Sequence, residues 1–493
     1  MKVLLVYPEF PDTFWSFKHA LRFIKRRASS PPLGLLTVAA MLPDTWEKRL
    51  VDLNVQALED VDLAWADYVF LSSMHVQRAS VDAVLARCRA QGVKVVAGGP
   101  LFTAEPEQFP GVEHLILNEA ELTLAPFLAD LVRGSPQQVY TTDDFPTLRE
   151  TPVPLWKLLD LKAYDSLSIQ FSRGCPFNCE FCNVTALFGH QVRVKSAAQI
   201  VAELDAIYDL GWRRSVFFVD DNFIGNKRVL KDEILPALIA WRKGKSGCRF
   251  ITEASINLAD DEELMALMSE AGFVSVFVGI ETPDEVSLRE CHKLQNTKRN
   301  LLESVKRLQR RGLQVMGGFI VGFDNDTTSI FQRQIAFIQK SGIVTAMVGL
   351  LQAPAGTPLY ERLLKEGRLL EQMSGNNTDG STNILPKMGL EVLQQGYRHL
   401  MQQIYSPKLF YERVRTFLRE YEMPKVGRRL WLGWDEVMAL LRSVYYLGIR
   451  GAERLHYWRL FFWTLFRFPK KFPLAITFAV YGYHFRKVSL LLV

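Results

Sequence analysis

The chain of 493 residues alternates short apolar runs with helical segments twice, and a Pro- and Asp-rich passage from Thr141 to Pro154 separates the two rounds. Apolar runs joined by helices are typical of parallel strands that are buried on both faces of a sheet. The first round predicts strands at Val3–Tyr7, Lys48–Asp52, Tyr68–Ser72, Lys94–Ala97 and His114–Leu117. The second predicts strands at Ser168–Ser172, Ser215–Val219, Arg249–Ala254, Ser275–Gly279, Gln314–Val321 and Val344–Leu350. We therefore expect two successive α/β domains, each built on a parallel sheet.

The same pattern sets the expected domain boundaries. Residues 1–140 are predicted to form a doubly wound, Rossmann-like domain, which would bind a ligand at the carboxyl ends of its strands. Residues 141–167 are the predicted linker, and residues 168–372 the second α/β domain. Residues 373–493 carry a helical, aromatic pattern that predicts a helical carboxyl-terminal extension. A chain of this length is expected to hold two to four domains.

Three cysteines, Cys175, Cys179 and Cys182, lie within eight residues just after the first strand of the second round. Three thiolates at this spacing can hold three irons of a [4Fe–4S] cube, and such clusters normally take four cysteines, so one iron is left open to a small molecule. A zinc site is the alternative, but zinc needs a fourth ligand and only His190 is near. Six cysteines in the whole chain are too few for a disulfide framework. The spacing favours the cluster.

With Phe181 before its third cysteine, this loop resembles the CxxxCxxC motif of radical S-adenosylmethionine (SAM) enzymes. The resemblance implies a partial (β/α)6 barrel whose open iron binds SAM and cleaves it to a 5′-deoxyadenosyl radical. It also implies an external electron donor of the flavodoxin or ferredoxin type. Residues at the ends of later strands match positions that contact SAM in this family, namely Asp220, Asp221, Asn222, Glu253, Ser255, Glu281 and Gly318. The alternatives are that Asp220–Asn222 caps a helix and that Glu281 is a solvated charge.

The first domain resembles a cobalamin-binding domain. Ser72-Ser73-Met74 is similar to its Ser-x-Leu motif, Gly98-Gly99 to its Gly-Gly motif, and Asn118–Glu121 to its Gly-Glu-x-Glu segment, although Asn118 replaces the glycine. The resemblance implies that cobalamin is seated by Ser72, Ser73, Gly98, Gly99 and Glu119. The Asp-x-His-x-x-Gly motif that supplies an axial histidine is absent, so the cobalt has no protein ligand or uses His19 or His75. A domain that binds no corrinoid is the other interpretation.

Over roughly residues 1–370 the chain resembles the cobalamin-dependent radical SAM class, which also shares the segment Pro354–Tyr360. The stretches Cys179–Gly189 and Val192–Lys195 resemble the subgroup with a carboxyl-terminal extension that includes the hopanoid C-2 methylase. This resemblance implies methylation of an unactivated carbon, on a small molecule or an apolar, isoprenoid lipid. One alternative is an enzyme that catalyses a radical cyclisation, rearrangement or group transfer without methylation. The other alternative is not an enzyme but a cobalamin-binding sensor or assembly module.

The carboxyl-terminal extension is basic and aromatic. Residues 401–493 contain 16 Lys and Arg against 6 Asp and Glu, whereas residues 1–400 contain 43 against 47. The longest uncharged run of the extension, Phe472–Phe485, has 14 residues, and a membrane-spanning helix needs about 20. Aromatic and basic residues on short helices suit the membrane interface. The alternative is a helical cap on the barrel, and since no RNA-binding module is recognisable, nucleic acid is not expected.

The expected location is the cytoplasm. The chain opens with a short strand ended by Pro8, without the pattern of a secretory signal. Unpaired cysteines and an oxygen-sensitive cluster favour a reducing compartment. Contact of the extension with a membrane would place the protein at the inner face of that membrane.

Overall fold

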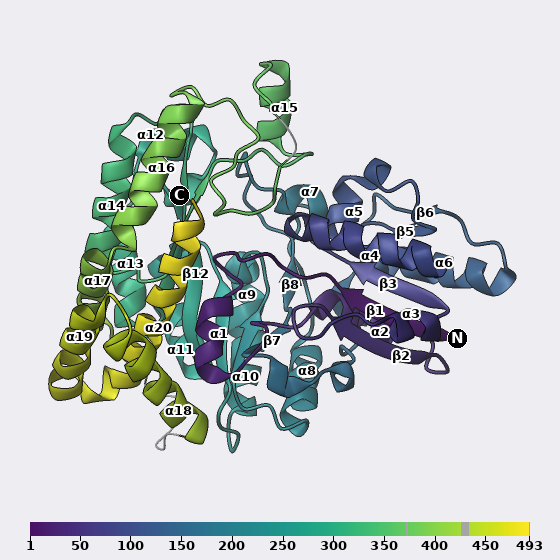
Figure 1. Cartoon of the computed structure of the whole chain (residues 1–493), viewed down its shortest axis with the longest axis horizontal. Coiled ribbons are helices and arrows are strands. Elements are labelled where there is room, and N and C mark those ends of the chain that lie inside the picture. Colours follow the sequence, from purple (N-terminus) through teal and green to yellow (C-terminus); the bar gives the residue numbers. More distant parts are fainter. Residues whose placement is uncertain (371–372, 425–432, 493) are drawn as a thin grey trace.

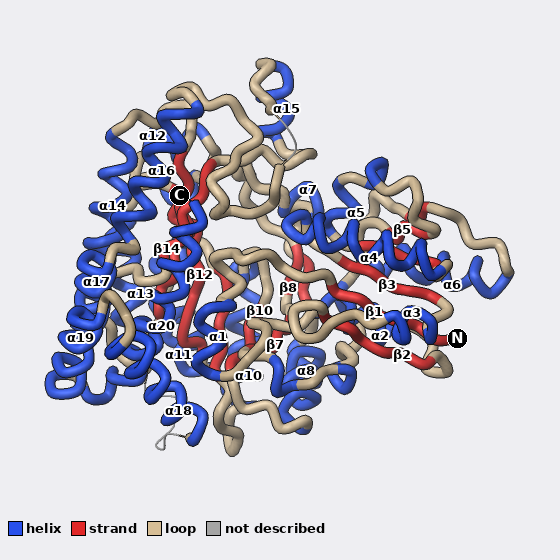
Figure 2. Tube along the Cα trace, in the orientation of Figure 1, coloured by secondary structure: helices blue, strands red, loops and turns tan. Residues whose placement is uncertain are grey.

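The computed structural model describes residues 1–370, 373–424 and 433–492, and its two parallel sheets lie next to each other (Figure 1). The first sheet is formed near the amino terminus, the second lies in the middle of the molecule, and the carboxyl-terminal helices cover the far side of the second (Figure 2). The predicted α/β architecture with a helical extension is confirmed.

The first sheet has the strand order β2-β1-β3-β4-β5-β6, with all neighbours parallel. Its strands are β1 (Lys2–Tyr7), β2 (Glu47–Asp52), β3 (Tyr68–Ser72), β4 (Lys94–Gly98), β5 (His114–Ile116) and β6 (Val139–Tyr140). The helices of this part are α1 (Lys18–Ile24), α2 (Leu33–Met41), α3 (Asp60–Trp65), α4 (Arg78–Gln91), α5 (Pro100–Ala104) and α6 (Ala120–Arg133). The five predicted strands are present. Strand β6 was not predicted, because two residues are too few to show a period.

The second sheet has the order β14-β13-β12-β11-β10-β7, again parallel throughout. Its strands are β7 (Ser166–Ile169), β10 (Ser215–Phe218), β11 (Arg249–Glu253), β12 (Phe273–Glu281), β13 (Gln314–Val321) and β14 (Ala346–Leu350). Chain order and spatial order coincide, and the two outer strands do not pair with each other, which gives an open, partial barrel.

The predicted strand Ser168–Ser172 is wrong in its bounds. Residues Ser168–Ser172 were expected to form a single strand, but β7 ends at Ile169, and β8 (Ser172–Arg173) pairs antiparallel with β9 (Arg193–Val194). The backbone N–H groups of Phe171 and Ser172 donate to the Asp220 carboxylate instead of to a neighbouring strand. A tertiary hydrogen bond therefore interrupts the strand, and no local pattern in the sequence signals it.

Helices cover the outer face of the barrel and the end of the chain. Those of the barrel are α7 (Val184–Phe188), α8 (Ala197–Asp209), α9 (Lys227–Val229), α10 (Leu235–Trp241), α11 (Glu262–Ala271), α12 (Glu285–Glu290), α13 (Leu301–Arg310), α14 (Ser329–Ser341) and α15 (Pro358–Lys365). The extension forms α16 (Leu390–Ile404), α17 (Pro407–Glu420), α18 (Trp434–Ser443), α19 (Arg454–Arg467) and α20 (Phe472–Ser489). In the described part of the chain, none of the helices combines the length and the hydropathy needed to span a bilayer.

The extension packs against the barrel and protects its last strand. The hydroxyls of Tyr397 on α16 and of Tyr405, directly after this helix, donate to the carbonyls of Val348 and Ala346 on β14, at 3.0 and 2.6 Å. These bonds use acceptors that an edge strand would otherwise leave open to another chain. The predicted helical cap on the barrel is thus present. Contact with a membrane would involve the exposed face of this cap.

The first and last helices of the chain lie side by side (Figure 1). The segment after β1 leaves the first sheet, and Phe14 stacks on Phe485 of α20 with ring centroids 4.2 Å apart. His484 Nε2 lies 3.0 Å from the Phe14 carbonyl and donates to it. The segment after β1, where the axial-histidine motif is absent, therefore serves as a packing surface for the extension.

Candidate active site

The three cysteines converge on one loop between β8 and β9. Gly174 enters this loop with a φ of 90°, and a Cβ there would lie 2.6 Å from the Gln191 carbonyl, so the turn requires glycine. Burial, together with the neighbouring thiols of Cys179 and Cys175, raises the pKa of the Cys182 thiol to about 12. The Cys175 and Cys179 thiols thus both act on the Cys182 thiol.

The loop is fixed at Glu180, between the second and third cysteines. Arg362 of α15 donates from Nε to Glu180 Oε1 at 2.5 Å and from Nη2 to Oε2 at 3.2 Å. The Glu180 N–H donates to the Cys291 carbonyl, and the Glu180 carbonyl accepts from Leu359 N–H, both at 3.0 Å. Paired guanidinium–carboxylate bonds of this kind fix orientation as well as distance.

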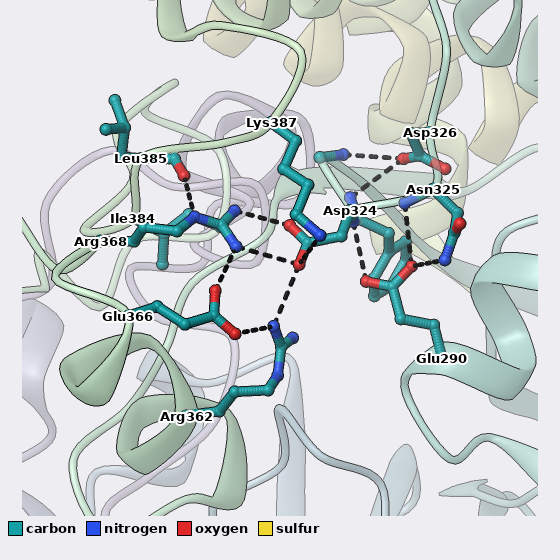
Figure 3. A network of polar contacts seen from close by, with 12 residues as sticks. Glu290, Asp324, Asn325, Asp326, Arg362, Glu366, Arg368, Ile384, Leu385 and Lys387 are labelled. Carbon is teal, nitrogen blue, oxygen red and sulfur yellow. Dashed lines mark hydrogen bonds and ion pairs between the residues drawn. The ribbon is translucent and has the colours of Figure 1, made fainter.

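Arg362 belongs to a larger ionic network around Asp324, which follows β13 (Figure 3). Arg368 contributes two hydrogen bonds to Asp324, at 2.6 and 3.0 Å, and Lys387 lies 3.3 Å from it. Although burial opposes ionisation, hydrogen bonds from Arg368 and Arg362 hold the pKa of Asp324 at about 2. The segment after β14 is thereby joined to both the barrel and the cysteine loop.

Asp220, predicted to contact SAM, is fully engaged with the protein. Its carboxylate accepts from the backbone N–H groups of Phe171 and Ser172 and from the Ser172 hydroxyl, the last at 2.6 Å. Burial raises its pKa to about 7 against these hydrogen bonds. In the structure Asp220 fixes the backbone of Phe171 and Ser172, which leads into the cysteine loop.

The other predicted polar residues lie at or just after the ends of β10 and β11, and Asn222 and Asp221 lie beside Cys175. Asn222 Oδ1 accepts from the Ser255 N–H at 3.1 Å, and its Nδ2 lies 4.0 Å from Cys175 Sγ. Asp221 Oδ2 is buried without a hydrogen-bond partner. Burial, followed by repulsion from Asp221 and Asp220, raises the pKa of Glu253 to about 8. An unpartnered carboxylate oxygen next to a second carboxyl group fits a cationic ligand such as an ammonium.

Lys293 is a site residue that the sequence reasoning missed. Its Nζ donates to Glu281 Oε1 at 2.7 Å. Although burial lowers the pKa of Lys293, the Glu281 carboxylate and then Cys179 hold it above its usual range. Gln295 was also missed, and its Nε2 lies 3.7 Å from Cys179 Sγ. Both follow α12 in a loop without a recognisable motif, so only the fold brings them to the cysteines.

Gly318 lies against an aromatic ring. A Cβ at this position would come within 2.7 Å of Phe277 Cζ. The Phe277 ring meets Trp15 edge to face at 5.3 Å, and Trp15 Nε1 donates to Met347 Sδ at 3.0 Å. A side chain from the amino-terminal part of the chain thus contacts residues of the barrel strands.

A cavity of about 410 Å³ opens at the carboxyl ends of β3 and β4, within the range of small-molecule sites. Of the residues predicted to seat cobalamin, Ser72, Gly98, Gly99 and Glu119 line it, whereas Ser73 does not. A Cβ on Gly98 would lie 2.6 Å from the Ile116 carbonyl, and one on Gly99, at φ 92°, 2.6 Å from Ser72 Oγ. Its apolar wall includes Leu33, Val38, Met41, Phe70 and Leu124.

The cavity suits the nucleotide tail of a corrinoid, because its apolar wall can accept an aromatic base and Gly98 and Gly99 add no side chains to its lining. It is bordered by both α/β units, since Gln170, Arg173 and Lys195 line it together with the residues of the first sheet. His19 and His75 do not line it. His19 lies 3.4 Å from Asp12, and His75 lies 3.4 Å from Glu105.

Three family profiles match the chain in succession. The B12 binding domain matches residues 21–128, the Radical SAM superfamily matches residues 169–338, and a domain of unknown function (DUF4070) matches residues 357–492. The first match contains β3 and β4 with their cavity, and the second contains the cysteine loop.

Curated relatives include proteins similar over nearly the whole chain. An uncharacterized methyltransferase of Synechocystis sp. is 42% identical over 491 residues, covering 98% of this chain and 91% of the relative. The hopanoid C-2 methylase of Rhodopseudomonas palustris is 35% identical over 471 residues, covering 93% and 88%.

Two solved structures share the fold. OxsB, a cobalamin-dependent SAM radical enzyme with aqua-cobalamin bound, has a TM-score of 0.63 at 13% identity, covering 99% of this chain and 80% of that one. TsrM from Kitasatospora setae, a radical SAM methyltransferase with cobalamin and a [4Fe–4S] cluster bound, has a TM-score of 0.59 at 15% identity and covers 99% of both chains.

Proposed function

This chain belongs to the cobalamin-binding radical SAM enzymes, and from that membership we propose that it methylates an unactivated carbon of an apolar, isoprenoid-type lipid. Its cofactors are a [4Fe–4S] cluster, SAM and cobalamin, and its reaction is methyl transfer to carbon. When bound, the cluster and SAM supply a 5′-deoxyadenosyl radical that removes hydrogen from the substrate, and cobalamin supplies the methyl group. We further propose an external electron donor of the flavodoxin or ferredoxin type.

We assign Cys175, Cys179 and Cys182 to the cluster. Asp221 and Glu253 would hold the amino group of SAM, since Asp221 Oδ2 is buried and has no partner. Lys293 is a buried cation whose charge acts on the thiols of the cysteine loop, and it would pair with the SAM carboxylate. Asn222 and Ser255 hold each other in place by hydrogen bonds and would present Asn222 to the cofactor. Asp220 would act through the backbone of Ser172 rather than by touching SAM.

The observation that carries the proposal is the cavity shared by the two α/β units. Ser72, Gly98 and Gly99 line it from the first unit, and Arg173, two residues before Cys175, lines it from the second. A corrinoid seated there would lie beside the SAM site, so that a carbon radical formed at one cofactor could be methylated from the other without leaving the protein.

A lipid substrate is supported by the nature of the relatives and of the extension. The hopanoid C-2 methylase is 35% identical to this chain, and the match extends over 93% of it, including the extension. A long apolar substrate would be delivered most directly from a membrane, and the extension offers a surface for that contact.

Anaerobic reconstitution tests the proposed function. Supplied with iron, sulfide and cobalamin, the chain should retain about four irons and one corrinoid. With SAM, a reductant and a lipid extract containing hopanoids, it should form 5′-deoxyadenosine and a lipid product heavier by one methyl group, read by mass spectrometry. Release of 5′-deoxyadenosine with water-soluble substrates alone would contradict the lipid assignment, and formation of no 5′-deoxyadenosine would contradict the radical mechanism.

We propose that helix α19 docks on an anionic lipid bilayer at the cytoplasmic face of the membrane. Its outer face exposes Leu455 (71%), Phe462 (49%) and Phe466 (80%), and the rings of Trp458, Phe462 and Phe466 stack in succession at 5.5 and 6.3 Å. Exposed Arg454, Arg459 and Arg467 accompany them, and α19 contains no Asp or Glu. Apolar rings among cations match the interface of a bilayer with acidic lipids.

Replacing Phe462 and Phe466 together by serine should weaken binding to phosphatidylglycerol-containing vesicles at least about tenfold, because two exposed rings lose their burial in the bilayer. Vesicle co-sedimentation measures this, and raised salt should weaken the binding of the unchanged protein. Val132→Ser on α6 removes another exposed apolar side chain, 86% accessible, as a control. Equal vesicle binding by the double variant and the unchanged protein would refute the proposal.

A further inference from the structure

Four charged side chains join the first α/β unit to the hairpin that holds the cysteine loop. Glu119 and Glu121 follow β5, whereas Arg173 lies on β8 and Arg193 on β9. Arg173 Nη1 donates to Glu119 Oε2 at 2.5 Å and to Glu121 Oε2 at 3.0 Å. Arg193 Nη1 donates to the same Glu119 oxygen at 3.0 Å, and its Nη2 lies 2.7 Å from Glu119 Oε1.

This interdomain network, defined as Glu119, Glu121, Arg173 and Arg193, is removed from water. Its side chains are between 4% and 13% exposed. Two carboxylates face two guanidinium groups, so the buried charges balance, and loss of either partner would leave a charge without compensation. Glu119 is therefore held by two arginines at the border of the cavity.

The network reaches both cofactor sites. Glu119, Glu121 and Arg173 line the shared cavity. Arg173 also donates from Nε to Gln170 Oε1 at 2.8 Å, which aligns it with the chain that leaves β7. At Asp221, after burial, Arg173 and Glu119 both affect the carboxyl group, the first lowering and the second raising its pKa. One set of contacts thus borders the proposed corrinoid seat and the proposed site of the SAM amino group.

We propose that Glu119 and Arg173 are positioning residues that set the separation and angle between the corrinoid seat and the SAM site, rather than ligands of either cofactor. This inference rests on the proposed function. Arg173 distributes its contacts over Nη1, Nη2 and Nε, which reach Glu119, Glu121 and Gln170. Lysine would keep the charge but concentrate it on one nitrogen and lose the contacts of the fork. A misplacement of about 1 Å between reacting groups can cost roughly 100-fold in rate.

Two products of SAM report separately on the two sites. S-adenosylhomocysteine forms when the S–CH3 bond breaks and the methyl group passes to the electron pair of two-electron-reduced cobalt, which requires both units in register. Methionine and 5′-deoxyadenosine would form when one electron, supplied by titanium(III) through the cluster, breaks the S–C5′ bond and the resulting 5′-deoxyadenosyl radical takes a hydrogen atom from the substrate. The second reaction requires the barrel alone.

The experiment compares Glu119→Gln and Arg173→Lys with the unchanged holoenzyme, loaded with cluster and cobalamin and reduced by titanium(III) citrate. We expect S-adenosylhomocysteine formation to fall roughly 100-fold in both variants, while 5′-deoxyadenosine formation stays within about threefold. Calorimetry of the apoproteins supplies a readout without cofactors, in which the variants should unfold roughly 5 °C lower. Retained iron should be unchanged.

Asp130→Asn is the matched control, because Asp130 is a buried carboxylate of the same unit that bonds Tyr140 and Arg133 away from the barrel. It should lower the unfolding temperature without changing the product ratio. An unchanged ratio in Glu119→Gln, or the same ratio change in Asp130→Asn, would overturn the inference alone. An unchanged protein that forms neither product would overturn the proposed function, and the inference with it.

Discussion

Replacement of Cys179 by serine abolishes formation of 5′-deoxyadenosine from SAM. Cys179 is only 7% exposed, and it lies between the two other cysteines within their electrostatic reach, so no other thiol of the loop can take its place. Serine keeps the volume of the side chain but replaces the soft thiolate that iron prefers. Iron content should fall from about four per chain to less than one, together with the cluster absorption in the visible spectrum.

Cys248→Ser provides the control for this prediction. Cys248 is buried, and its Sγ lies 3.7 Å from the Trp212 carbonyl, at the opposite end of β11 from Glu253. Its replacement should leave iron content and product formation unchanged. If Cys179→Ser retained a full complement of iron while Cys248→Ser lost it, the assignment of the cluster to the loop would be wrong.

Replacement of Gly34 by tryptophan should prevent cobalamin binding while leaving the cluster intact. Gly34 lies in the first turn of α2 and lines the 410 Å³ cavity, and a Cβ there would meet no atom within 4 Å. A large side chain can therefore enter the cavity without clashing with the backbone. We expect at least about 100-fold weaker binding, since a filled pocket forfeits most of the contacts that bury a ligand.

The corrinoid absorption retained after gel filtration measures this effect, and iron analysis of the same sample shows whether the barrel is unaffected. Gly34→Ala adds a single carbon and should weaken binding far less than tryptophan does. Full corrinoid binding by Gly34→Trp would place the cofactor elsewhere. Loss of iron as well as corrinoid would mean that the substitution disturbs the whole fold.

The periodicity of the sequence was sufficient to predict most of the fold. The bounds of β3 and β13 agree with the predicted strands residue for residue, and those of β10 and β11 differ by one residue. Alternation of buried strands with helices is a local property, so it can be read from a short window. The bounds of β7 could not be predicted, because the Asp220 carboxylate, about fifty residues away in the chain, takes the N–H groups that would continue the strand.

The same distinction between local and tertiary information applies to the residues of the site. Cys175, Cys179 and Cys182 could be recognised because all three lie in one short loop with a distinctive spacing. Lys293 and Gln295 belong to a stretch without a motif, and they reach the cysteines only because α12 returns the chain to the mouth of the barrel. Motif resemblance placed Glu119 at the cavity, but its pairing with Arg173 and Arg193 depends on how the two units meet.

By itself, the sequence determined the order of strands and helices, the cysteine loop and the pair of glycines at the end of β4, since each depends on spacing within a short stretch. Only the tertiary structure decided which charges balance one another. Arg362 binds Glu180, and Arg173 binds Glu119, across 182 and 54 residues. A buried ion pair depends on geometry that is set after the sheets have packed together, and these pairs connect the parts of the chain that the local patterns left separate.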